Sequence, residues 1–114
     1  MTELVLFVLD SEIGKPAVNL EVSFQCQNEQ SVYHLTHRGF TGTDGCARVE
    51  MLPVCGKDAL KSHQILIQTG DYYSDRHKNI TFREICIEFL WDRQQKLVLP
   101  VLISAHSYTT YRGN

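Results

Sequence analysis

The fold of this chain is decided by residues 97–114, which read LVLPVLISAHSYTTYRGN. Residues 97–103 are all Leu, Val, Ile or Pro, and a shorter segment with two tyrosines follows Ser104. A short apolar run of this kind is typical of a buried β-strand, because strands span about 4–8 residues and most helices are longer. The ending therefore predicts two strands, over 96–104 and over 107–112.

Earlier parts of the chain show the same pattern of short β segments between turns. Residues 18–26 carry Leu20, Val22 and Phe24 at every second position, which is the period of a half-buried strand. Gly-Lys-Pro at 14–16 separates this segment from the apolar run 3–10, so we expect two antiparallel strands there. Further strands are expected over 31–38, 47–51, 63–69 and 80–91, with a polar loop and one helical turn over 70–79. About eight strands and at most one short helix predict an all-β, eight-stranded β-sandwich.

Composition limits the classes of protein to consider. The 114 residues match one domain over 1–114, and 43% apolar residues suffice for a core without disulfides or a structural metal. Eleven basic and 13 acidic residues, with no block of like charge, argue against nucleic acid or an anionic membrane as a partner. The apolar runs 4–9 and 97–103 are shorter than the ~20 residues of a membrane span, and Glu3 stands where a signal peptide has positive charge. We therefore expect a soluble, cytoplasmic protein.

The spacing of cysteines and histidines does not predict a metal site. The four cysteines are Cys26, Cys46, Cys55 and Cys86. They form no Cys-x-x-Cys motif, so we expect reduced thiols. His34 and His37 are the only close histidine pair, and their spacing puts them on opposite faces of a strand. We expect no metal and no cofactor, and we place His34, His37, His63 and His77 on the solvent side or in loops.

Six different short motifs are distributed along the whole chain. They are Val-Leu-Asp at 8–10, Gly-Lys-Pro-Ala at 14–17, Thr-Gly-Asp-Tyr-Tyr at 69–73, Phe-Arg-Glu-Ile at 82–85, Pro-Val-Leu-Ile-Ser at 100–104 and Tyr-Arg-Gly-Asn at 111–114. In this order they resemble the transthyretin-like family over the whole chain. The enzyme branch of that family, the 5-hydroxyisourate hydrolases of urate breakdown, ends in Tyr-Arg-Gly-Ser after a Pro-Leu-Leu-Leu-Ser strand.

The resemblance implies both an assembly and a site. The assembly is a homotetramer, a dimer of dimers, with a channel between the dimers. The hydrolase site combines a histidine from the first strand, an arginine after the Asp-Gly turn, a histidine before the Pro-Leu-Leu motif and the terminal serine. Such a set suits general-base delivery of water to a cyclic ureide, because histidine titrates near neutral pH and arginine binds a developing anion.

All four of those positions carry other residues in this chain. They are Phe7, Cys46, Val98 and Asn114. Without a group that titrates near pH 7, the family's general-base hydrolysis lacks its base. We therefore expect that hydrolysis of 5-hydroxyisourate by this route has been lost.

The same alignment predicts which side chains face the channel. The expected ligand-binding residues are Phe7, Leu9, Val98, Pro100, Leu102, Thr109, Tyr111 and Arg112. The candidate catalytic residues are Cys46, Tyr111, Arg112 and Asn114. A mostly apolar wall with a few polar groups suits a small aromatic or heterocyclic ring. The reading favoured here is a small cyclic metabolite that is bound, and transformed, in the channel.

Two other functions stay open at this point. The channel can carry a hydrophobic ligand without chemistry, or the protein can be a scaffold that keeps only the tetramer. Phe7 and Val98 are also compatible with plain packing. His106 suits a subunit contact, and Arg112 can equally pair with Glu3 or with the carboxylate of Asn114.

Asp10 has a separate, structural interpretation. It stands just before Gly14, and aspartates at such positions accept N–H groups of the turn that follows.

Overall fold

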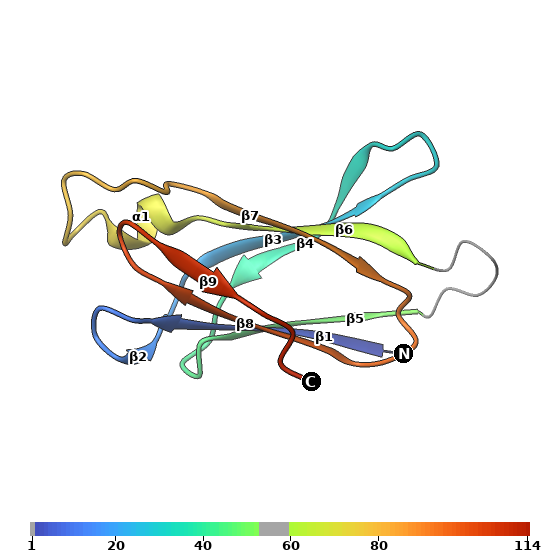
Figure 1. The fold of residues 1–114 in the computed structure, drawn as a ribbon, viewed down its shortest axis with the longest axis horizontal. Coiled ribbons are helices and arrows are strands. Elements are labelled where there is room, and N and C mark those ends of the chain that lie inside the picture. Colours follow the sequence, from blue (N-terminus) through green and yellow to red (C-terminus); the bar gives the residue numbers. More distant parts are fainter. Residues whose placement is uncertain (1, 53–59) are drawn as a thin grey trace.

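The computed structural model describes residues 2–52 and 60–114 and contains two β-sheets packed face to face (Figure 1). The elements are β1 (Thr2–Asp10), β2 (Lys15–Pro16), β3 (Glu21–Gln27), β4 (Tyr33–Phe40), β5 (Cys46–Met51), β6 (Lys61–Ile67), α1 (Thr69–Tyr73), β7 (Ile85–Trp91), β8 (Leu97–Ile103) and β9 (Tyr108–Thr110). The predicted all-β sandwich with one short helix is confirmed. The ninth strand is the two-residue β2, which pairs with the end of β1.

The two sheets have four and five strands. One has the order β2-β1-β8-β9, with β5 pairing β1 on the same side as β2, and the other has the order β4-β3-β6-β7. β1 and β8 are parallel neighbours, from Leu4 beside Leu97 to Asp10 beside Ile103. Figure 1 shows α1 at one end of the sandwich, away from both chain ends.

The sequence suggested that the strands over 3–10 and 18–26 pair with each other, and this expectation is wrong. β1 and β3 lie in opposite sheets, because the segment between them crosses from one sheet to the other. The amide of Ala17 still donates to the carbonyl of Val8 in the first sheet, at 2.9 Å. The amide of Leu20 donates to Thr41 Oγ1 beside the second sheet, also at 2.9 Å.

The core lies between the sheets and follows the period of two. Leu4, Leu6 and Val8 of β1 are buried against Val22 of β3 and Ile65 of β6. The alternate residues of β1, among them Phe7 and Leu9, point to the outer side of the sheet. Within residues 2–52 and 60–114, no helix is long and apolar enough to cross a membrane.

The strand expected over 80–91 begins only at Ile85. Residues 81–83 are held by partners outside the sheet: the amide of Thr81 donates to the carbonyl of Ala105, at 2.9 Å. The amide of Gly70 donates to the carbonyl of Arg83, at 2.8 Å. These bonds use backbone groups that a longer β7 would have paired across the sheet.

His63 was expected on the solvent side or in a loop, and this expectation is wrong. It lies in β6, is only 3% exposed and shares the inward face with Ile65. Its ring packs 5.6 Å from Phe89 and 5.5 Å from Trp91, between ring centroids. Burial, opposed by a hydrogen bond to the Lys61 carbonyl and aided by nearby Arg93, lowers the pKa of His63.

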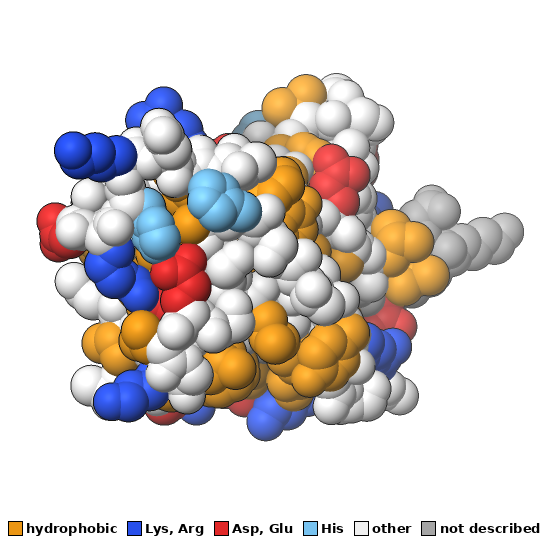
Figure 2. Space-filling model, turned by 60° about the vertical axis from the view of Figure 1, so that its left-hand side comes forward, with side chains coloured by type: hydrophobic (Ala, Val, Ile, Leu, Met, Phe, Trp, Pro, Cys, Tyr) orange, Lys and Arg blue, Asp and Glu red, His pale blue; other side chains and the backbone are white. Residues whose placement is uncertain are grey.

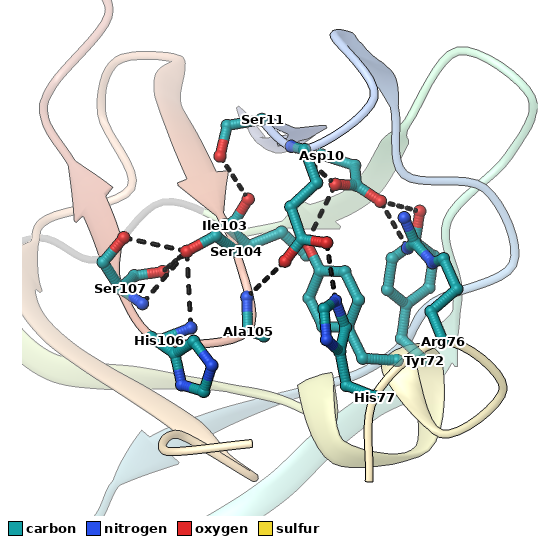
Figure 3. Close-up of polar contacts among 12 residues, drawn as sticks. Asp10, Ser11, Tyr72, Arg76, His77, Ile103, Ser104, Ala105, His106 and Ser107 are labelled. Atoms are coloured by element: carbon teal, nitrogen blue, oxygen red, sulfur yellow. Dashed lines mark hydrogen bonds and ion pairs between the residues drawn. The ribbon is translucent and has the colours of Figure 1, made fainter. Parts of the chain in front are cut away.

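Asp10 ties β1 to α1 at the end of the sandwich (Figure 3). Its buried carboxylate accepts hydrogen bonds from the Glu12 amide at 3.0 Å and from the hydroxyls of Tyr72 and Tyr73 at 2.9 Å each. Arg76 Nη2 completes the set at 2.6 Å. Asp10 is therefore structural, as expected, but most of its partners come from a segment more than 60 residues away.

The turn before β5 requires a glycine, which leads to a testable expectation. Gly45 has φ +77°, and a Cβ there would lie 2.6 Å from the Val8 carbonyl oxygen. We expect Gly45→Ala to lower the free energy of unfolding by about 1–3 kcal/mol in urea titrations, through strain and displacement of this contact. Gly39→Ala, where a Cβ meets nothing within 4 Å, is the control. Equal effects of the two changes would contradict the explanation.

Candidate functional site

The candidate site is the outward side of the β5-β1-β8-β9 sheet, here called the outer sheet face. It is formed by the residues of these strands that alternate with the core residues, which are Glu3, Val5, Phe7, Leu9, Cys46, Arg48, Glu50, Val98, Pro100, Leu102 and Thr109. The register puts Phe7 between Cys46 on one side and Pro100 on the other. Of the eight expected ligand-binding residues, strand alternation puts six on this face.

The middle of the outer sheet face is apolar and partly covered. Phe7, Leu9 and Leu102 are each half-buried although they point away from the core. The chain end adds to this cover, because the Gly113 amide donates to the Val98 carbonyl at 2.8 Å. A Cβ at Gly113 would lie 2.9 Å from Pro100 Cγ, so only glycine permits this approach.

Cys46 lies where the hydrolase arginine was expected, at the start of β5. Its amide donates to Asp44 Oδ1 at 2.9 Å, which closes the Asp-Gly turn. Burial and the neighbouring carboxylate of Asp44 raise the pKa of the Cys46 thiol. At neutral pH the thiol is therefore protonated and a weak nucleophile.

Asn114 is occupied with the backbone of β8. Its Nδ2 donates to the Lys96 carbonyl at 2.6 Å, and its Oδ1 accepts from the Val98 amide at 3.2 Å. The side-chain amide thus takes the place of a neighbouring strand. Its side-chain carbonyl and one N–H therefore hold the chain end against the backbone of residues 96–98.

Tyr111 and Arg112 diverge at the end of the chain. Tyr111 is 56% exposed. Arg112, which is exposed, lines a cavity of about 190 Å³ together with Trp91 and Leu97. Glu3, one expected partner of Arg112, forms an ion pair with Lys96 at 3.4 Å instead.

Arg48 was missed in the sequence, although the period of two could have found it. It follows Cys46 by two residues and lies beside Val5 on the outer sheet face. Its guanidinium pairs with Asp44 at 3.2 Å, and both side chains are about half exposed. Arg48, rather than Arg112, is the guanidinium on the strands that form this face.

The histidines lie elsewhere. His34 and His37 are in β4, His63 is in β6, His77 follows α1, and His106 is in the turn between β8 and β9. In the part of the chain that the structure describes, no three His, Cys, Asp or Glu side chains are grouped as metal ligands. Cys26, Cys46 and Cys86 are free thiols, and Cys55 lies outside the described residues.

The comparisons with known proteins agree with this architecture. Residues 4–113 match the model of the HIUase/Transthyretin family. The 5-hydroxyisourate hydrolase of Salmonella typhimurium is 30% identical over 112 residues, which cover 97% of this chain and 80% of that protein. The structure of the Klebsiella pneumoniae 5-hydroxyisourate hydrolase superposes with a TM-score of 0.79 at 23% identity, covering 100% of this chain and 94% of that one. Transthyretin from Sparus aurata gives a TM-score of 0.80 at 18% identity, with 96% and 94% covered.

Sequence and fold point to the same relatives. The family model spans nearly the whole chain, and the hydrolase relative is similar over almost all of it. This chain therefore belongs to the HIUase/transthyretin family.

Proposed function

We propose that this protein binds a small cyclic, largely apolar metabolite on its outer sheet face and does not hydrolyse 5-hydroxyisourate by a histidine-dependent route. The observation that carries the proposal is the composition of that face. Its strands present Phe7, Val98 and Pro100 there, whereas all five histidines lie elsewhere. The names of the relatives point to hydrolysis, and the proposal departs from them because this face lacks an imidazole base.

The candidate catalytic groups support binding over chemistry. The Cys46 thiol is held protonated, and Asn114 is bonded to the backbone of β8. Arg112 lies beyond the end of β9 and lines a separate cavity with Trp91 and Leu97. What remains is the Tyr111 hydroxyl and the Arg48 guanidinium. Arg48 pairs with Asp44 in a half-exposed ion pair, and its other N–H groups can orient a carbonyl or an acidic group on a ring.

Assembly completes the site in this proposal. A ligand pocket covers about 70–90% of its ligand, and one open sheet face cannot do so. A second copy facing the first would supply the opposite wall, and the family resemblance implies a dimer of dimers with such a channel. We infer a homotetramer, for which light scattering at micromolar concentration is the check. A stable monomer would contradict this inference.

The neutral fluorophore N-phenylnaphthylamine tests the apolar site directly. We expect its fluorescence to rise on binding the tetramer, because it moves from water into an apolar channel. Val98→Glu should weaken this binding by roughly tenfold or more, since burying an unpaired carboxylate is costly. The matched control is Leu35→Glu, which adds the same charge on β4 at a side chain that is 57% exposed.

The controls make the result decisive. Light scattering and urea titration identify any variant that fails to assemble or fold. Equal loss of binding in Val98→Glu and Leu35→Glu would overturn the location of the site. No binding by the unmodified tetramer would overturn the proposal itself.

A further inference from the structure

A second concave site lies at the α1 end of the sandwich, and sequence reasoning did not foresee it. The cavity measures about 640 Å³, which is within the range of small-molecule pockets. Its polar lining includes Ser74, His77, Lys78, Thr81, Arg83 and His106. Figure 2, which brings this end forward, shows histidine side chains close together at the surface with Lys or Arg side chains nearby.

The lining has an excess of positive charge. Lys78 and Arg83 both line the cavity, and no Asp or Glu does. Across residues 2–52 and 60–114, neither cation has a side-chain hydrogen bond or ion pair. By contrast, Arg38, Arg48, Arg76 and Lys96 are each paired with a carboxylate. Two unpaired cations therefore share one cavity.

The carboxylate next to the cavity is already engaged. Glu12 Oε1 lies 2.7 Å from His77 Nε2, and Glu12 Oε2 accepts from the Ala105 amide at 2.7 Å (Figure 3). Both oxygens are thus held by groups on the rim, and the hydrogen bond to His77 lowers the pKa of Glu12. Glu12 positions the rim rather than neutralising Lys78 or Arg83.

Three chain segments hold the walls in place. Thr81 Oγ1 lies 2.9 Å from His106 Nδ1, and the Thr81 amide donates to the Ala105 carbonyl. The rings of His77 and His106 are 6.3 Å apart, between centroids. This contact engages Nδ1 of His106, and which of the two atoms donates depends on the tautomer of the ring. The other ring nitrogen, Nε2, is left for a polar contact with a ligand.

We propose that this cavity binds a small metabolite through its carboxylate or phosphate oxygens. Arg83 would bind two oxygens with its planar fork, and Lys78 would add a compact charge. The side-chain NH₂ group of Asn79, which also lines the cavity, can add a donor, and the His106 ring lies on the same wall. The site is separate from the outer sheet face and does not depend on the function proposed for it.

Calorimetric titration of the assembled protein with citrate and with inorganic phosphate at low ionic strength tests the proposal. At least one probe should bind, and the tighter one identifies the class of oxyanion. We expect Lys78→Gln with Arg83→Gln to raise the dissociation constant roughly tenfold or more, because charge-assisted hydrogen bonds are among the strongest polar contacts. The control is Lys15→Gln with Lys61→Gln, which changes the net charge equally and should have little effect.

Nuclear magnetic resonance locates the bound anion. The imidazole C–H signals of His77 and His106 should shift during the titration, whereas those of His34 on β4 should not. If the two double variants lost equal affinity for the anion, the anion would be attracted by net charge only, and the proposed site would be overturned. Failure of both probes to bind, or binding that leaves His106 unshifted, would also overturn it.

Discussion

Replacing Asp10 with asparagine is expected to lower the free energy of unfolding by about 3–5 kcal/mol, because it removes a buried carboxylate that pairs with a partly exposed arginine and accepts hydrogen bonds from two tyrosines. The carboxylate is 0% exposed and holds Arg76, Tyr72 and Tyr73 around it. An amide carries no charge to balance Arg76, and its NH₂ group faces donors instead of accepting from them. Urea titration at neutral pH measures the loss.

Asp44→Asn is the matched control for this change. Asp44 also accepts an amide two residues ahead and pairs with an arginine, but its side chain is 52% exposed. Water replaces lost contacts at such a site, so we expect little change in stability. Comparable losses in the two variants would contradict the view that burial makes Asp10 important.

The effect of Asp10 should also depend on pH. Burial alone raises the pKa of its carboxyl, but the hydrogen bonds from Arg76 and the two tyrosines outweigh burial, so the pKa lies below its ordinary value of 3.8. A folded-state pKa below the unfolded one stabilises the protein at neutral pH, and this stabilisation is lost as pH falls through the folded pKa. The stability gap between the unmodified protein and Asp10→Asn should therefore narrow under acid conditions. A gap that widens would contradict this assignment.

Restoring the four hydrolase positions should produce the largest functional change. We expect 5-hydroxyisourate to decay at the same rate with the unmodified protein as in buffer alone. The quadruple variant Phe7→His, Cys46→Arg, Val98→His and Asn114→Ser should accelerate it by about 10²–10⁴-fold, the usual contribution of a positioned general base. Ultraviolet absorbance of freshly made 5-hydroxyisourate measures both rates.

A variant with only three of the four substitutions provides the control. The triple variant that keeps Val98 should recover little, because catalytic groups that act as a unit are strongly non-additive. Acceleration by the unmodified protein would mean that another group supplies the base. A quadruple variant that folds and assembles but stays inactive would contradict the correspondence of these four positions.

Local sequence patterns predict much of the fold and most of the residues on the outer sheet face. The alternation in 3–10 and 96–104 predicted which residues of β1 and β8 face outward, because successive side chains of a strand point to opposite sides. The same rule could have placed His63 inside, since it shares its face with Ile65, and Arg48 outside, since it follows Cys46 by two. Both placements therefore follow from the alternation of the strand alone.

Long-range contacts lay beyond sequence reasoning. The pairing of Asp10 with Tyr72 and Arg76 joins segments more than 60 residues apart. The predicted start of the strand 80–91 was wrong for a similar reason, because the backbones of Thr81 and Arg83 bond to Ala105 and Gly70. Nothing near these residues in the sequence indicates such partners.

By itself, the sequence determined the β-sandwich, the family motifs and the absence of histidine from the expected hydrolase positions, because residue type and a period of two are local properties. Only the tertiary structure decided that Arg112 lines a cavity with Trp91 and Leu97, and that Lys78, Arg83 and His106 line another. The physical reason is that a cavity is made where separate segments meet. Their meeting depends on how the two sheets and α1 close on one another.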